Sequence, residues 1–428
     1  MMDNSLIAAA LPVGEFDGGP VESQFDAMLA VVRRLGAQPV TADPVAGEEA
    51  ARRSVETLSV QHPDLLLIVP LRGLSAQAIE AAARLSRVPV LVCPVQGGFA
   101  LPSSALAVGA LRPAQAPVEL LYAPVDHAEF ATRLGWALRS ARAWSRLRAG
   151  RIGVVGGLFP NLVSCRYDAG ALHARLGTGL LPIPFERLRR MIQATPPALL
   201  EQAGAALTAP FDLPAADREA IPAGVGLHLA LKQIAADENL DGFAAECWSA
   251  FPRELGLNPC LGFLEDAYTL ACEGDVLLCV ALLAARALAG ASAYAGDLYD
   301  LDMDGVMTLT HCGAPASLAS DQSRVVVGRS QLAQARGFET LTCRPALPPG
   351  PVTVFRFYGP GCDELHLASG ELLASEHSPS LGARIRLAGD RWAFLERCLG
   401  NHYVAAAGDL RPELRLLSRW LGIAIFET

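Results

Sequence analysis

Two acidic clusters bracket an apolar stretch near the middle of this 428-residue sequence. Glu273 stands before the apolar span 276–295, and Asp297 and Asp300 stand after it. A span of this length packs on a core along its whole length, so the residues at its ends are held in place. Carboxylates beside buried apolar surface are costly unless they are paired, hydrogen-bonded or bound to a cation. We therefore place the candidate active site in residues 246–315.

The spacing of the acids suits a metal site. Glu273 and Asp297 lie 24 positions apart. That distance lets one helix leave a loop and the chain return along the next strand, so both carboxylates can face one crevice. Carboxylate oxygens suit Mn²⁺ or Mg²⁺, and an added imidazole favours Mn²⁺. Of the eight histidines, His402 is the first candidate because it forms a polar pair with Asn401 between apolar runs, and His311 is the second.

The same residues also have a purely structural interpretation. Each acid can cap a helix or pair with an arginine, and each histidine can be a hydrogen-bonded core residue. Asp275, in particular, is in position to cap a helix that begins after it and ends at Gly290. Spacing alone leaves both interpretations open.

Composition indicates a large globular protein whose surface is partly covered by other subunits. Apolar residues make up 51% of the chain and charged residues 18%, below the roughly 25% charged residues usual in globular domains. We therefore expect a homo-oligomer. The formal net charge is -9, and lysines and arginines do not gather into a basic patch. This argues against nucleic acid and anionic membranes as partners and favours a small neutral molecule.

The sequence also predicts a cytoplasmic protein. The apolar span is nearly long enough to cross a membrane, but Arg286 interrupts it, acids flank it, and nearly half of it is Ala or Gly. A buried helix is expected instead. The amino terminus lacks a cationic start, and residues 6–13 are too short and too strand-like for a signal peptide. The ten cysteines show no CxxC spacing, and we interpret them as reduced core thiols.

Residues 1–150 alternate strand and helix signals. The predicted strands are short apolar or β-branched runs at 6–12, 38–42, 65–70, 88–93 and 118–123. Helical patterns lie between most of them, so the sequence predicts βαβ units and an amino-terminal Rossmann-like α/β domain with an open parallel sheet. Ligands gather at the carboxyl ends of such strands. The loops 12–15 and 70–73 would line a pocket there.

Two further domains are predicted. A central α/β domain, residues 151–322, opens with a strand that ends in Gly156 and Gly157. This is not a GxGxxG motif, and an acidic residue at the expected distance is missing, so we interpret the glycines as a tight turn. Over residues 323–428, short strand candidates separated by Gly and Pro largely replace the helices. They predict a small antiparallel sheet or β-barrel domain that supplies a histidine ligand.

Several motifs stand in one order along the chain: Ala-Glu-Cys-Trp-Ser-Ala-Phe-Pro at 245–252, Asn-Pro-Cys at 258–260, Cys-Glu-Gly-Asp at 272–275, Asp297, Leu-Thr-His-Cys-Gly at 309–313 and Gly-Asn-His at 400–402. In content, order and spacing they resemble the L-fucose isomerase and L-arabinose isomerase superfamily. The likeness is firmest over 246–315, extends to 401–409 and 151–161, and is thin over the first 150 residues.

This resemblance implies two Rossmann-like α/β domains followed by a carboxyl-terminal β-barrel. It also implies homotrimers or homohexamers with the active site between subunits, and a Mn²⁺-dependent isomerase that converts a free aldose into a ketose. Glu273 and Asp297 match the family's two carboxylate ligands, and His402 matches its imidazole ligand. Asn401 matches a sugar-contacting residue beside that ligand.

The resemblance gives roles to further residues. Trp248 and Glu246 stand where the family lines its sugar pocket. His311 corresponds to a further histidine ligand of the arabinose enzyme, and Asp300 competes with Asp297 for the second carboxylate position.

An ene-diol route is the mechanism expected for such a site. The metal acts as a Lewis acid on the carbonyl oxygen and the neighbouring hydroxyl of the sugar. One carboxylate takes the proton from carbon 2 and returns it to carbon 1. We favour Glu273 as this base and Asp297 as its acidic partner, with the two roles exchangeable at this point.

Two other functions stay open. The chain is shorter than well-known members of the family, and its amino-terminal part lacks clear sugar-binding signatures, so the substrate need not be fucose or arabinose. Two Rossmann-like lobes can clamp a sugar without chemistry, as in a sugar-binding or regulatory protein. A metal-dependent hydrolase or lyase would use the same acidic cluster to activate water.

Overall fold

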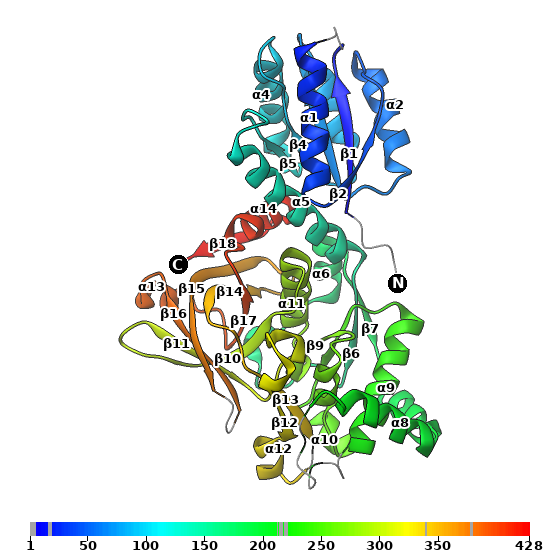
Figure 1. Ribbon diagram of the computed structural model, residues 1–428, viewed down its shortest axis with the longest axis vertical. Helices are drawn as coiled ribbons and strands as arrows, with labels where there is room; N and C mark the ends of the chain where they lie inside the picture. Colours follow the sequence, from blue (N-terminus) through cyan, green and yellow to red (C-terminus); the bar gives the residue numbers. More distant parts are fainter. Residues whose placement is uncertain are drawn as a thin grey trace. The chain divides into compact units, whose positions relative to one another are not determined.

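The computed structural model describes residues 6–15, 19–211, 213, 217, 221–338, 340–376 and 380–428. The chain divides into two compact units (Figure 1). The first comprises Met1–Ser145 with Pro412–Gly422, and the second comprises Arg146–Arg411 with Ile423–Thr428.

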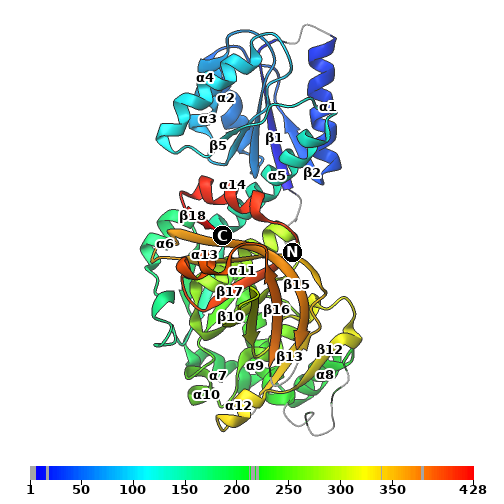
Figure 2. The ribbon, with the colours of Figure 1, turned by 90° about the vertical axis from the view of Figure 1, so that its left-hand side faces the viewer.

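In its described part, the first unit holds a five-stranded parallel sheet with the order β2-β1-β3-β4-β5. The strands are β1 (Leu6–Val13), β2 (Ala37–Thr41), β3 (Leu65–Pro70), β4 (Val90–Val92) and β5 (Val118–Leu120). The helices are α1 (Pro20–Arg34), α2 (Glu48–Ser59), α3 (Ala76–Leu85), α4 (Ala100–Leu111) and α5 (Ala128–Ala149). Figure 2 shows α1 on one face of the sheet and α2, α3 and α4 on the other. The five predicted strands and the open parallel sheet are confirmed.

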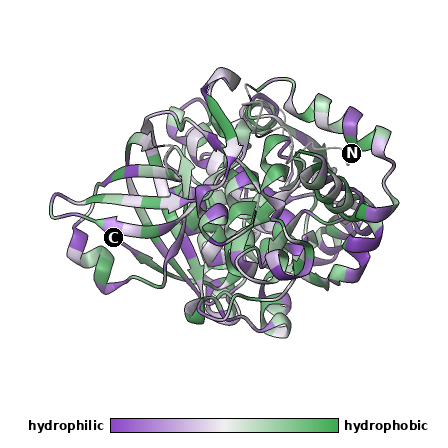
Figure 3. Ribbon diagram, turned by 90° about the horizontal axis from the view of Figure 1, so that it is seen from below, coloured by the Kyte–Doolittle hydropathy of each residue, from purple (hydrophilic) through white to green (hydrophobic). Residues whose placement is uncertain are grey.

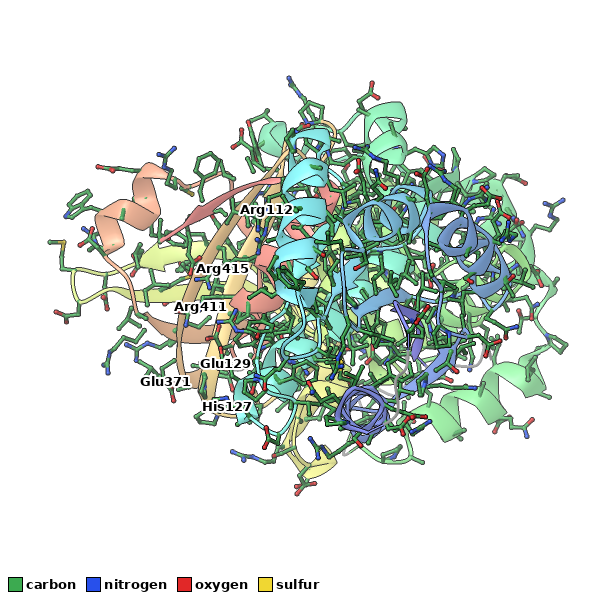
Figure 4. The ribbon with its side chains drawn as sticks, turned by 90° about the horizontal axis from the view of Figure 1, so that it is seen from above. Arg112, His127, Glu129, Glu371, Arg411 and Arg415 are labelled. Atoms are coloured by element: carbon green, nitrogen blue, oxygen red, sulfur yellow. The ribbon has the colours of Figure 1, made fainter. Side chains whose placement is uncertain are left out.

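A helix from the end of the chain completes this unit. Most of α14 (Arg411–Leu421) belongs to the first unit. Arg139 on α5 donates a hydrogen bond of 2.6 Å to the buried carboxylate of Glu413 on α14. Arg411, labelled in Figure 4, begins the helix and pairs with Asp409. The carboxyl-terminal sequence therefore contributes to both units.

The second unit opens with a parallel sheet in the order β7-β6-β8-β9. These strands are β6 (Arg151–Val155), β7 (Gly179–Pro182), β8 (Gly242–Ala245) and β9 (Thr269–Ala271). The helices around them are α6 (Ala169–Leu176), α7 (Phe185–Ala194), α8 (Pro197–Thr208), α9 (Ile221–Glu238), α10 (Ala250–Leu255) and α11 (Val276–Ala289).

Helix α11 is the central element of this unit. It packs against β8 and β9 on one side and against barrel strands on the other (Figure 1). This explains why its sequence is apolar all round. The Asp275 carboxylate caps its first turn, and Gly290 ends it with a left-handed conformation, as predicted. In Figure 3 hydrophobic residues fill the inner helices and strands, and hydrophilic residues follow the outer helices and loops. Because α11 ends at Gly290 and β10 begins at Tyr294, the apolar span 276–295 contains a helix and the start of a strand.

Further strands of this unit form a closed antiparallel barrel. Within the described chain its six strands follow the order β14-β17-β10-β11-β16-β15, and β14 pairs with β15 to close it. They are β10 (Tyr294–Leu301), β11 (Val306–His311), β14 (Gly350–Tyr358), β15 (Glu364–Glu376), β16 (Leu381–Leu387) and β17 (His402–Ala407). Strand β18 (Ala424–Glu427) adds to β15 in parallel, and α13 (Arg391–Glu396) lies between β16 and β17 in sequence. The predicted fold class, parallel α/β sheets followed by a barrel, is confirmed.

A separate hairpin interrupts the barrel sequence. Strands β12 (Val325–Arg329) and β13 (Leu341–Pro345) pair with each other, and α12 (Gln331–Ala335) connects them. Because β10 and β11 precede residue 323, the barrel takes strands from both sides of the predicted domain boundary. The division at residues 150 and 322 stays a prediction. Among the helices of the described chain, none is long and apolar enough to cross a membrane.

Candidate metal centre

Four side chains converge where β9 ends beside the barrel. Among the described residues, Glu273, Asp297, His311 and His402 each offer one ligand atom, and these atoms lie within 4.8 Å of one another. Asp297 on β10 is the cross-strand partner of His402 on β17. On its other side Asp297 pairs with Thr310, the residue before His311 on β11. Adjacent barrel strands therefore bring together residues that are far apart in the sequence.

The loop after β9 places Glu273. Its backbone is left-handed, with φ 58° and ψ 17°, in the single 3-10 turn η5 (Cys272–Gly274). The Glu273 carbonyl accepts a hydrogen bond from the Phe159 N–H at 2.9 Å. A Cβ at Gly274 would lie 1.7 Å from the Gly157 carbonyl oxygen. The missing side chain at Gly274 therefore permits the close approach of its loop to the turn after β6, where Gly157 has a positive φ of 79°.

His402 is fully buried and oriented by Asp275. Its Nδ1 lies 2.9 Å from Asp275 Oδ2, and the other oxygen of that carboxylate accepts from the Leu278 N–H at the start of α11. Its Nε2 lies 3.4 Å from Asp297 Oδ1 and 4.0 Å from Glu273 Oε2. Within the described chain this nitrogen makes no hydrogen bond. A buried ring nitrogen that faces two carboxylates and is fixed from behind by a third has the arrangement of a metal ligand.

Burial and charge set the protonation of these groups in opposite directions. Burial raises the pKa of Glu273 to about 7; nearby carboxylates add to the rise and His402 opposes it. Burial alone would raise the pKa of Asp275, but the His402 hydrogen bond and the Arg356 guanidinium lower it to about 2. Burial disfavours the imidazolium of His402, yet Asp275 outweighs this and raises its pKa well above the usual value.

His311 differs from His402 because burial lowers its pKa, which leaves the ring neutral near pH 7. Its ring centroid lies 6.3 Å from that of His402. A neutral imidazole can donate a lone pair to a cation. The donor set of two carboxylates and two imidazoles therefore fits one divalent ion such as Mn²⁺.

Asn401 and Asp300 occupy different environments on the barrel. Asn401 Nδ2 donates to Asp297 Oδ1 at 2.5 Å, so its amide is bound to a cluster carboxylate. The Asp297 side chain is 37% exposed, which makes it the open side of the cluster. A bulge shifts the register between Leu298 and Asp300. Asp300 is consequently exposed and outside the cluster, with its carboxylate on the Leu301 N–H. Among the described residues, Asp297 and not Asp300 thus belongs to the cluster.

The Glu246 carboxylate binds the backbone of the loop that follows it. Its buried carboxylate accepts hydrogen bonds from the N–H groups of Trp248 and Ser249, at 3.1 and 2.9 Å, and from the Ser249 hydroxyl at 2.8 Å. It also accepts from the Ala250 N–H that begins α10. These bonds occupy the carboxylate and hold the loop that carries Trp248.

Trp248 lines a small cavity beside the cluster. Glu273 and His311 line the same cavity. The Arg336 guanidinium lies over the Trp248 ring, with its carbon 4.0 Å from the ring centroid. Of the predicted sugar-pocket residues, Trp248 therefore faces the cavity.

Sequence reasoning missed the second role of Asp275. It identified the helix cap but not the contact with His402, because that contact joins the start of α11 to β17, two elements distant in sequence. Arg336 lacked a signal, because its partner Trp248 is distant in sequence. The turn at Gly157 was predicted, but its contact with the loop of Glu273 was not.

No known protein-family model matches this chain. The chain is 25% identical to the sulfoquinovose isomerase of Alkalicoccus urumqiensis over 386 residues, which make up 85% of this chain and 86% of that relative. Along most of its length it is therefore similar to a sugar isomerase.

Proposed function

We propose that this protein is an aldose-ketose isomerase that acts on a free monosaccharide and depends on a divalent cation, with Mn²⁺ as the proposed ion. The observation that carries the proposal is the buried Nε2 of His402, which faces Asp297 and Glu273 without a hydrogen-bond partner among the described residues. The similarity to a sulfoquinovose isomerase supports the same class of reaction.

Glu273, Asp297 and His402 would hold the cation, with His311 as a fourth ligand. When bound, the cation supplies a Lewis acid for the carbonyl oxygen and the neighbouring hydroxyl of the sugar. Asp275 keeps the proton of His402 on Nδ1 through its 2.9 Å contact, so that the Nε2 lone pair points into the site.

Glu273 is the proposed base. Its carboxylate is 13% exposed, and a raised pKa makes it a stronger base than an ordinary carboxylate. It would take the proton from carbon 2 of the aldose and return it to carbon 1. Asp297, more exposed and held by Asn401, would exchange a proton with the sugar oxygens.

The sugar, the assembly and the location belong to the same proposal. The motif resemblance leaves the sugar open, and the relative's name points to a sulfonated aldose. We further propose three domains divided near residues 150 and 322, a homotrimer or homohexamer, and a cytoplasmic location.

Isomerisation in heavy water tests the function. Mn²⁺-loaded protein would be incubated with a panel of aldoses that includes fucose, arabinose and sulfoquinovose. We expect a ketose with one solvent deuterium at carbon 1. Glu273→Gln should abolish the reaction, whereas Asp300→Asn, on the same barrel rim but outside the cluster, should retain it.

Two outcomes would contradict the proposal and favour another function. Tight sugar binding without any ketose would indicate a sugar-binding or regulatory protein. Smaller products instead of an isomer of equal mass would indicate a metal-dependent hydrolase or lyase.

A further inference from the structure

The cavity beside the metal centre carries its own recognition groups. Glu273 and His311 line it from the centre, and Trp248, Asn258 and Arg336 line it from the surrounding loops. Of the described residues that line this cavity, Arg336 alone is an arginine or lysine. The cavity therefore contains one positively charged side chain, Arg336, and shares Glu273 and His311 with the proposed metal centre.

The Arg336 guanidinium lies against two aromatic rings. Its carbon lies 4.0 Å from the Trp248 ring centroid and 5.4 Å from that of Phe338. Its Nη2 donates to the Trp248 carbonyl oxygen. A guanidinium has five N–H donors in one plane, a geometry that matches the oxygens of an anionic group.

Asn258 provides a second, independent feature. Its side chain is 7% exposed, and its Oδ1 is buried without a hydrogen-bond partner in the described part of the chain. Leaving a buried polar atom unpaired is costly unless a ligand or water satisfies it. A sugar hydroxyl supplies the donor that this oxygen lacks.

We propose that this cavity binds a singly charged anionic group, of the sulfonate class, on the part of the sugar remote from the reacting carbons. The inference rests on the proposed function, because it defines the substrate of the same site. Two carboxylates offset the charge of one divalent cation, so the metal centre itself does not attract an anion. One guanidinium matches one negative charge, whereas a phosphate dianion would need a second cation. The expected small neutral partner is thus replaced by a small monoanion.

Binding requires Arg336 to exchange partners. The cavity has a volume of about 10 Å³, roughly the space of one water molecule. A sulfonate enters when the guanidinium gives up the Trp248 carbonyl and turns toward the ligand.

Direct binding to Mn²⁺-loaded protein tests the subsite without relying on turnover. The probes are methyl 6-deoxy-6-sulfoglucoside, methyl glucoside and methyl glucoside 6-phosphate, none of which can open its ring and isomerise. Titration calorimetry would compare the wild type with Arg336→Met and Arg336→Lys. Arg336→Met should weaken binding of the sulfonate about 10- to 100-fold and change binding of methyl glucoside less than about threefold. Arg336→Lys should weaken sulfonate binding less than Arg336→Met, because lysine keeps the positive charge but lacks the planar set of N–H donors.

Two results would overturn the subsite. One is equal weakening of the sulfonate and the neutral glycoside by Arg336→Met. The other is a phosphate probe that binds the wild type more tightly than the sulfonate. Unchanged Mn²⁺ affinity and thermal unfolding in both variants show that the centre and the fold are intact. Failure of the wild type to isomerise any aldose would refute the proposed function instead, so the two failures are separable.

Discussion

Replacing Glu273 by glutamine should stabilise the metal-free protein at alkaline pH. Burial raises the pKa of this carboxyl from 4.5 to about 7 in the folded chain. Between these values the folded state binds the proton more tightly than the unfolded state. The stability that the proton provides is therefore present below pH 4.5 and lost as pH rises through 7. Each pKa unit corresponds to about 1.4 kcal/mol, so the ionised carboxylate costs about 3 kcal/mol at pH 8.

Glutamine has nearly the same shape but cannot ionise. Glu273→Gln should therefore be about 3 kcal/mol more stable than the wild type at pH 8 and differ by less than about 1 kcal/mol at pH 5. Urea unfolding of metal-stripped protein at both pH values measures the difference. Asp300→Asn removes an exposed carboxylate of the same unit and should change stability by less than about 0.5 kcal/mol at either pH. A gain that is equal at both pH values, or absent at pH 8, would refute the reasoning.

Three further predictions concern the parts that build the centre. Asp275→Asn should weaken Mn²⁺ binding about 10- to 100-fold, because asparagine has no negative charge and only one acceptor oxygen for the two groups that Asp275 binds, His402 Nδ1 and the Leu278 N–H. Unchanged affinity in calorimetry would contradict this role. Because the pKa of His402 is raised in the metal-free fold, Mn²⁺ should displace a proton from its ring, and affinity should rise about tenfold per pH unit near neutrality. Titration calorimetry in buffers of different ionisation enthalpy detects the released proton. If no proton is released, Mn²⁺ does not displace one from His402. Gly274→Ala should destabilise the fold by more than about 3 kcal/mol in thermal unfolding, since its Cβ would lie 1.7 Å from the Gly157 carbonyl. Gly290→Ala, also at positive φ but in open space, should cost only about 1 kcal/mol, and equal losses would show that the loop contact is unimportant.

Local pattern was sufficient for the parallel sheets. Short apolar strands that alternate with helices specify βαβ units by their own periodicity, so the first unit follows from its sequence. The barrel was harder. Strands β10 and β11 lie before residue 323, and their partners β17 and β16 come much later in the chain. Such long-range pairing has no local signature, which is why the sequence did not assign β10 and β11 to the barrel.

The candidate site shows the same limit. Residue types and motif order suggested that Glu273, Asp297 and His402 approach one another, and the structure places their ligand atoms within 4.8 Å. The choice between Asp297 and Asp300 depended on a bulge in β10, which one sequence does not reveal. The motif resemblance predicted Glu246 as a sugar-pocket residue, and this stays a prediction. The structure adds that the N–H groups of Ser249 and Ala250 donate to its carboxylate, a contact that the sequence did not indicate.

The central claim is that the cluster around Asp297 binds one divalent cation. Measuring Mn²⁺ binding by two variants with substitutions on β10 tests it most directly. Asp297 and Asp300 both stand on β10, but only Asp297 belongs to the cluster. Calorimetric titration of the wild type should find one Mn²⁺ per chain, retained by Asp300→Asn and weakened at least about 100-fold by Asp297→Asn. A wild type that binds no divalent cation, or an Asp297→Asn variant that binds it as tightly as Asp300→Asn, would contradict the account.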